Sequence, residues 1–112
     1  MDLEFADRKL RKRCETEKEA IRAWGRQCAG KLMRRLVQIE AADSLAVLMQ
    51  IPGARCHPLK GDRAGQFVVD LEHPRRLVFE PAGDTTRFSE RGVLLPERVT
   101  AVRILEVVDY HD

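Results

Sequence analysis

The chain has 112 residues, which is enough for one domain with a modest core and too few for two. Its 44% hydrophobic and 34% charged residues exclude a disordered chain and predict a fold with a strongly ionic surface. The 20 basic and 18 acidic residues nearly cancel, so net charge alone indicates no partner. The basic residues are concentrated in residues 1–40, however, and this distribution favours nucleic acid or an acidic protein as a partner.

The cysteine pattern and the absence of long apolar runs indicate the cellular compartment of the protein. Cys14, Cys28 and Cys56 form no CxxC pair and leave an odd thiol under any pairing, which suits the reducing cytosol. No apolar run approaches the roughly 18 residues that a membrane span needs. The start of the chain also lacks the apolar segment of a signal peptide. We therefore expect a cytoplasmic protein that does not associate with membranes.

The first residues are predicted to form a short strand followed by a helix. Residues 2–5, DLEF, can form an edge strand with Leu3 and Phe5 on one face. Asp7 is suited to begin a helix because its carboxylate can accept a free backbone N–H of the first turn. Leu10 and Cys14, four residues apart, are then expected on the inner side of that helix.

A capping box, TEKE at 16–19, predicts a second and longer helix. Apolar residues recur every three or four positions along it and predict one buried stripe: Ile21, Trp24, Cys28, Leu32, Leu36 and Ile39. Arg34 and Arg35 are expected away from this stripe, on the solvated side. Gly25 and Gly30 each weaken a helix by about 1 kcal/mol relative to alanine, which permits a bend.

The remaining elements are a short helix and a run of strands. Asp43 is expected to cap a short apolar helix that stops at a Pro-Gly pair. The segments QFVVDL (66–71), RRLVFEP (75–81) and VTAVRILEVVDY (99–110) predict three strands of an antiparallel meander, with a turn at Pro74. The loop at 82–98 is long, and its VLL segment is expected to form a small extra element. This order predicts an α+β fold, with residues 1–112 as a single domain.

Two polar clusters carry the functional interpretation: HPLKGDRAGQ at 57–66 and VVDYHD at 107–112. Metal-free cleavage of RNA requires a base, an acid and cations that stabilise the phosphate. Histidine is suited to proton transfer near neutral pH, and lysine or arginine supplies the charge. The residues that could take these roles are His57 and His111 for proton transfer, Lys60, Arg63 and Arg76 for the phosphate, Tyr110 for stacking or hydrogen bonding, and Asp109 for orienting a histidine.

Each cluster also fits an ordinary surface turn or chain terminus, since Pro, Gly and Asp favour turns and Lys and Arg remain solvated. The sequence has no Gly-rich phosphate loop. The three histidines lie on separate predicted elements, so neither a metal nor another cofactor is expected.

The segments LKGDRAGQFVVDLEHPRRLVFEP and VRILEVVDYH resemble the HigB-like branch of the RelE/ParE toxin superfamily. The resemblance covers nearly the whole chain and is strongest at 57–81 and 102–111. It implies a curved antiparallel sheet with two main helices packed on one face. It also implies the toxin of a bacterial type II toxin-antitoxin system, a ribosome-dependent endoribonuclease that cleaves translated mRNA. The implied partner is a HigA-like helix-turn-helix antitoxin, through which alone the toxin would reach operator DNA.

By position, the resemblance assigns two groups of site residues. The catalytic group is His57, Asp109, Tyr110 and His111, and the group that binds RNA phosphate is Lys60, Arg63 and Arg76. The sequence leaves open which histidine is the acid and which is the base. Arg75 departs from the family pattern, which has an aromatic residue at this position, and the loop at 82–98 is longer than usual.

Two alternatives remain open. The first is a non-nucleolytic toxin of the same fold that binds a protein, as ParE-type members bind DNA gyrase; the paired histidines argue against it. The second is a degenerate toxin that acts only with its antitoxin in operon repression. The altered HPRR segment and the long loop keep this second alternative open.

Overall fold

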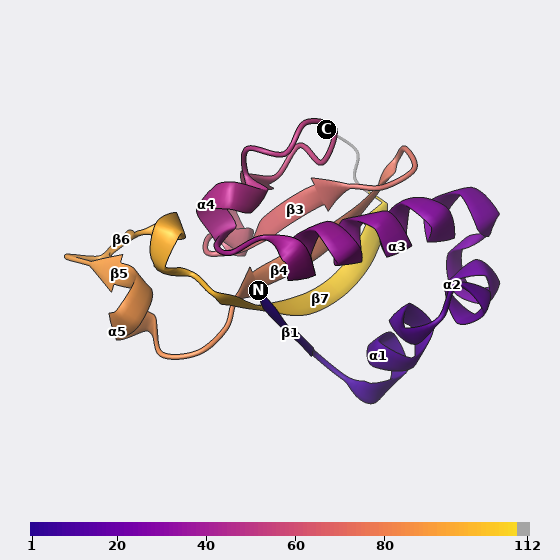
Figure 1. Cartoon of the computed structure of the whole chain (residues 1–112), viewed down its shortest axis with the longest axis horizontal. Coiled ribbons are helices and arrows are strands. Elements are labelled where there is room, and N and C mark those ends of the chain that lie inside the picture. Colours follow the sequence, from indigo (N-terminus) through magenta and orange to yellow (C-terminus); the bar gives the residue numbers. More distant parts are fainter. Residues whose placement is uncertain (110–112) are drawn as a thin grey trace.

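The structure is a computed structural model that describes residues 1–109, in which helices pack on one face of a five-stranded sheet (Figure 1). The strand order is β1–β7–β4–β3–β2, with β1 parallel to β7 and the other neighbours antiparallel. The strands are β1 (Asp2–Phe5), β2 (His57–Pro58), β3 (Phe67–Asp70), β4 (Arg75–Pro81) and β7 (Ala101–Asp109). The predicted α+β class and the meander β3–β4–β7 are therefore confirmed.

Three helices follow β1: α1 (Arg8–Glu15), α2 (Glu17–Trp24) and α3 (Arg26–Ala41). The predicted caps are confirmed, because Asp7 accepts the Leu10 N–H and Thr16 accepts the Glu19 N–H. The single long helix predicted after residue 16 is in fact two helices, and the break falls at Gly25, one of the two glycines at which the sequence permitted a bend. Gly25 has φ +85° and ψ 164°, a conformation outside the helical region that essentially only glycine adopts, and the chain breaks there.

The short helix α4 (Leu45–Leu48) begins one residue later than predicted. Ser44 rather than Asp43 is its cap, with the Ser44 hydroxyl accepting the Val47 N–H at 3.4 Å. Leu45 and Leu48 are fully buried, so the apolar character predicted for this helix is confirmed. No helix within residues 1–109 is both long and apolar enough to cross a membrane.

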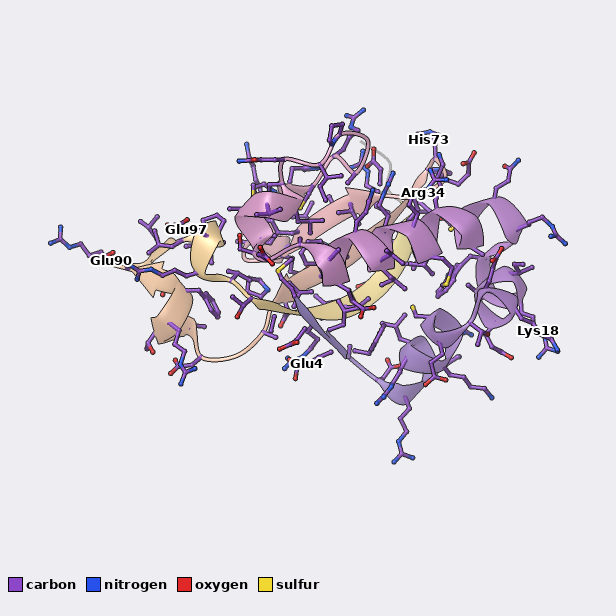
Figure 2. All side chains as sticks on the ribbon, viewed as in Figure 1. Glu4, Lys18, Arg34, His73, Glu90 and Glu97 are labelled. Carbon is purple, nitrogen blue, oxygen red and sulfur yellow. The ribbon has the colours of Figure 1, made fainter. Side chains whose placement is uncertain are left out.

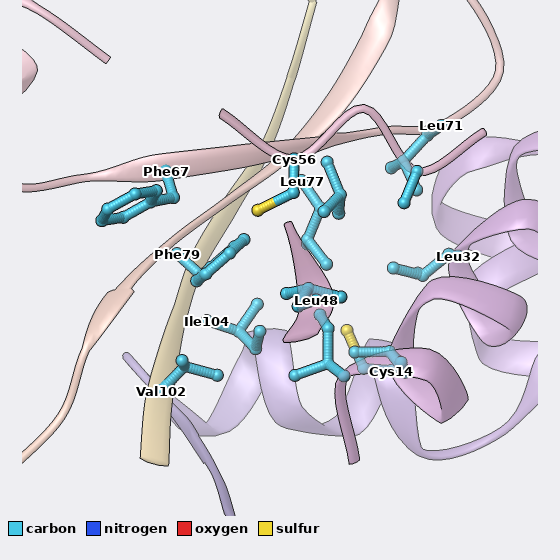
Figure 3. Close-up of a cluster of buried hydrophobic side chains, with 14 of the residues drawn as sticks. Cys14, Leu32, Leu48, Cys56, Phe67, Leu71, Leu77, Phe79, Val102 and Ile104 are labelled. Carbon is cyan, nitrogen blue, oxygen red and sulfur yellow. The ribbon is translucent and has the colours of Figure 1, made fainter. Parts of the chain in front are cut away.

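The main core lies between α3 and the sheet (Figure 3). From Cys28 onward the predicted stripe is buried, whereas its first two members, Ile21 and Trp24, are only half-buried. Phe67 of β3 and Phe79 of β4 stack with their ring centroids 5.9 Å apart. The side chains that fill the rest of this layer include Leu32, Leu48, Leu71, Leu77, Val102 and Ile104.

Arg35 was predicted to lie on the solvated side of α3, and this was wrong. It is only 7% exposed. Its Nε donates to the Asp70 carbonyl at 2.7 Å and its Nη2 donates to the Gly53 carbonyl at 2.8 Å. Burial lowers the pKa of the Arg35 guanidinium. The side chain therefore fastens α3 to β3 and to the loop before β2, while Arg34 projects into solvent (Figure 2).

Residues 82–98, which we call the arm, project from one end of the sheet (Figure 1). The arm contains α5 (Thr85–Phe88), the paired strands β5 (Ser89–Glu90) and β6 (Val93–Leu94), and the 3-10 turn η2 (Pro96–Arg98). The extra element expected at VLL is therefore confirmed. Phe88 is buried and attaches the arm to the core, whereas Glu90 and Glu97 point away from it (Figure 2).

Candidate functional site

Alternate residues of β2, β3, β4 and β7 project from the sheet face opposite α3, which we call the second face. Its apolar part is a small separate cluster of Leu59, Val68 and Val78, with Leu105 and Val108 packed against it. Directly paired residues of antiparallel strands project on the same side, so the register arranges the second face in rows. One row is His57, Val68, Val78 and Glu106, and the next is Asp70, Arg76 and Val108.

His57 occupies the edge of the second face. The sequence predicted a turn over 57–66, but the segment begins as the two-residue strand β2, paired with Phe67 and Val68. Its Nδ1 lies 2.8 Å from the Arg55 carbonyl oxygen, which favours the tautomer that carries hydrogen on Nδ1. In the neutral ring Nε2 then carries a lone pair. This arrangement suits a proton acceptor.

The second row is a group of ion pairs around Asp70. Asp70 Oδ2 lies 3.3 Å from Arg55 Nε, and Asp70 Oδ1 lies 3.3 Å from Arg76 Nε. Oδ1 is buried and accepts no hydrogen bond from residues 1–109, so its contact with Arg76 is electrostatic and not an aligned hydrogen bond. Asp70 thus lies between two guanidinium groups, those of Arg55 and Arg76.

The turn after β2 supplies the other two predicted phosphate-binding residues. It contains the 3-10 turn η1 (Gly61–Arg63), with Lys60 exposed at its start. Arg63 donates from Nη1 to Gln66 at 2.9 Å and from Nη2 to Glu106 Oε2 at 3.3 Å. The Arg63 guanidinium therefore reaches β7, although β3 and β4 lie between β2 and β7 in the sheet.

Asp109 is directed to the other side of the sheet. It pairs directly with Arg75, and Arg75 Nε lies 3.2 Å from Asp109 Oδ1. Arg75 Nη1 also donates to the Trp24 carbonyl at 2.5 Å, and hydrogen bonding with Cys28, more than with Asp109, raises the pKa of Arg75. The structure thus places His57, Arg63 and Arg76 on the second face and does not place Asp109 with them. Tyr110 and His111 lie outside the described residues.

Three residues that contact the predicted site residues were not predicted from the sequence. Arg55, Asp70 and Glu106 each pair with another charged group on the second face. Alternation along β3 and β7 predicts the side of the sheet on which Asp70 and Glu106 lie, but their partners depend on the register between strands. Within residues 1–109, no three His, Cys, Asp or Glu side chains are grouped so as to hold a metal ion.

Comparisons with known proteins show the fold. No protein-family model matches the sequence, and no curated protein sequence matches it. Among solved structures, the chain is similar to a YoeB/ParE toxin from Agrobacterium tumefaciens, with a TM-score of 0.60 and 13% sequence identity. The similarity covers 99% of this chain and 100% of that chain. At this identity the similarity establishes a shared fold, in agreement with the layer arrangement expected from the sequence.

Proposed function

We propose that this protein is the toxin of a bacterial type II toxin-antitoxin pair and acts as a ribosome-dependent endoribonuclease on translated mRNA. The fold shared with a YoeB/ParE toxin supports the toxin assignment. The observation that carries the nuclease assignment is the placement of His57, Arg63 and Arg76 on one sheet face. We assign the protein to the HigB-like branch, in the cytoplasm, with a HigA-like antitoxin as partner.

The proposed reaction is an internal transesterification of the RNA. The 2′-oxygen attacks the adjacent phosphorus, the bond from phosphorus to the 5′-oxygen breaks, and the products are a 2′,3′-cyclic phosphate and a 5′-hydroxyl. His57 and His111 divide the two proton transfers, one accepting the 2′-hydroxyl proton and the other donating to the leaving 5′-oxygen. Arg76, Arg63 and Lys60 stabilise the charge that develops on the phosphate.

The carboxy-terminal residues have supporting roles in this proposal. Tyr110 positions a nucleotide. Asp109 acts through its ion pair with Arg75, which fixes the end of β7 beside β4. Asp109 is therefore a positioning residue and His57 a catalytic one.

The experiment is inducible expression in bacteria, with growth and the 5′ ends of mRNA as readouts. We expect growth arrest and new cuts inside translated codons for the wild type, and neither for His57→Ala or Arg76→Ala. Arg34→Ala, a solvent-exposed change on α3, is the control and should behave as the wild type. Unchanged cleavage in a variant that combines His57→Ala and His111→Ala would refute the nuclease assignment.

One observation favours the gyrase-binding alternative. Arg63 and Arg76 each already have a carboxylate neighbour, so a phosphate would have to displace Glu106 or Asp70, whereas a protein partner would not. Growth arrest without mRNA cuts, together with inhibition of DNA supercoiling by purified gyrase, would support this alternative. Absence of arrest from well-expressed protein would instead favour a degenerate toxin.

A further inference from the structure

A hollow of about 200 Å³ lies where β1 stops pairing with β7. The last residue pair of these strands is Phe5 with Ile104, and beyond it β7 borders α1. Lys9 and Arg13 of α1, Trp24 of α2, and Leu105 and Glu106 of β7 line this hollow. Glu106 also belongs to the second face, so the hollow adjoins the proposed cleavage site.

Trp24 gives the hollow an aromatic wall. The residue was expected in the core, but it is half-buried and also lines a larger hollow of about 450 Å³ beside Arg75. Its backbone is held in place because Arg75 Nη1 donates to the Trp24 carbonyl. A partly exposed indole next to cations is the combination on which single-stranded nucleic acid is bound without sequence readout.

The charges around the hollow leave two cations available. Neither Lys9 nor Arg13 has an ion-pair partner within the part of the chain that the structure describes. The two carboxylates at the hollow are both engaged, since Asp7 accepts the Leu10 N–H at 2.8 Å and Glu106 lies 3.3 Å from Arg63. Asp7 keeps its negative charge, but Lys9, Arg13 and the Arg63 that pairs with Glu106 outnumber the two carboxylates, so the hollow is net positive and suits a phosphodiester.

We propose that Trp24, Lys9 and Arg13 form a nucleotide-binding subsite for single-stranded RNA next to the second face. One base stacks on Trp24, and the adjoining phosphates bind Lys9 and Arg13. The inference rests on the proposed function, because the RNA bound at this subsite is the strand that is proposed to be cleaved on the second face. It adds a nucleotide-binding position at a distance from the scissile phosphate.

The test is direct binding of a uridine hexanucleotide to the purified full-length protein without ribosomes. Trp24 is the only tryptophan in the chain, so quenching of its fluorescence reports on binding beside this side chain, and the dependence on Lys9 and Arg13 assigns the binding to this hollow. We expect saturable quenching in the wild type. In a variant with Lys9→Ala and Arg13→Ala we expect at least tenfold weaker binding. A plot of log K against log salt should also be shallower by about 1.4, or about 0.7 for each phosphate that the variant no longer neutralises.

The matched control is a variant with Arg11→Ala and Lys12→Ala. It removes the same charge from the same helix, but neither side chain lines the hollow. It should bind nearly as the wild type does. Absence of quenching, or equal weakening in the two double variants, would overturn the subsite. Thermal unfolding of each variant confirms that the protein is folded.

The same experiment separates failure of the subsite from failure of the proposed function. His57→Ala should abolish mRNA cleavage and leave the quenching unchanged. Cleavage in cells without quenching by the hexanucleotide would refute the subsite alone. Quenching that depends on Lys9 and Arg13 in a protein that cuts no mRNA would support the subsite and refute the nuclease.

Discussion

Arg63 and Glu106 lie 43 residues apart in the chain, yet Arg63 Nη2 is 3.3 Å from Glu106 Oε2. The pair joins the turn after β2 to the strand that leads to Asp109, with β3 and β4 between them in the sheet. It therefore links the segment of the first predicted polar cluster to the strand that carries the second. In the absence of RNA, Glu106 therefore forms an ion pair with Arg63, one of the proposed phosphate-binding residues.

Glu106→Gln should strengthen RNA binding. The change keeps the side-chain shape and removes the charge that competes with phosphate for Arg63. We expect the dissociation constant for an oligoribonucleotide to fall about threefold to tenfold, and the salt dependence to steepen by about 0.7 if Arg63 then neutralises one more phosphate. Fluorescence anisotropy at several salt concentrations measures both quantities.

The control for this prediction is Glu80→Gln. Glu80 lies on the same face and pairs with Arg103 at 3.6 Å rather than with Arg63. Equal increases in affinity in the two variants would indicate a general effect of net charge and would remove Arg63 from the proposed site.

Arg35→Ala should lower the free energy of unfolding by roughly 3 kcal/mol, because it leaves the carbonyls of Asp70 and Gly53 without their donor inside the fold. Urea denaturation followed by circular dichroism measures this change. The neighbouring Arg34→Ala removes an exposed guanidinium and should stay within about 0.5 kcal/mol of the wild type. A similarly small effect of Arg35→Ala would show that the buried hydrogen bonds contribute little.

Two glycine substitutions of the same kind should have opposite effects. Gly25→Ala forces a side chain into a backbone with φ +85° and should destabilise the protein by about 1–3 kcal/mol. Gly30→Ala lies inside α3, where an added methyl group meets no atom within 4 Å, and should stabilise it by about 0.5–1 kcal/mol. Thermal unfolding of both variants provides the comparison. A stabilising Gly25→Ala would mean that α2 and α3 join into one helix without penalty.

Stability should fall at alkaline pH because of two buried thiols. Burial raises the pKa of Cys14 to about 11 and that of Cys56 to about 12. The unfolded chain releases these protons near its ordinary thiol pKa of about 9, whereas the folded protein retains them. The stabilisation present below pH 9 is therefore lost as pH rises toward about 11 for Cys14 and about 12 for Cys56.

The slope is about 1.4 kcal/mol per pH unit for each thiol. A variant with Cys14→Ala and Cys56→Ala should show a shallower decline in free energy of unfolding across this range, whatever its stability at neutral pH. Parallel declines in the two proteins would show that other groups cause the alkaline loss. Urea titrations at successive pH values measure both slopes.

Local signals in the sequence predicted most of the elements but not their relationships. The caps at Asp7 and Thr16 and the strand at 75–81 depend on neighbouring residues, and these predictions were confirmed. Both Gly25 and Gly30 weaken a helix, yet only Gly25 takes a non-helical conformation and breaks it. Arg35 was predicted on the solvated side because its hydrogen-bond acceptors, the carbonyls of Asp70 and Gly53, come from segments distant in the sequence.

For the candidate site too, the sequence predicted individual residues but not their partners. Residue type and resemblance selected His57, Arg63 and Arg76, which lie on one face of the sheet. Their partners Asp70 and Glu106 depend on strand register, which no local pattern encodes. Trp24 fitted the apolar stripe, yet it is only half-buried at the last residue of α2.

The outer edge of β1 has a consequence for self-association. In a parallel pair with β7, the N–H and C=O groups of Leu3 and Phe5 face away from β7, toward the free side of the sheet. A second copy that paired antiparallel through these groups would set Glu4 directly opposite the other Glu4, and like charges at that position destabilise the pairing. The acidic residues of this short strand thus act against growth of a continuous sheet between molecules, while the edge remains open to a strand of different charge.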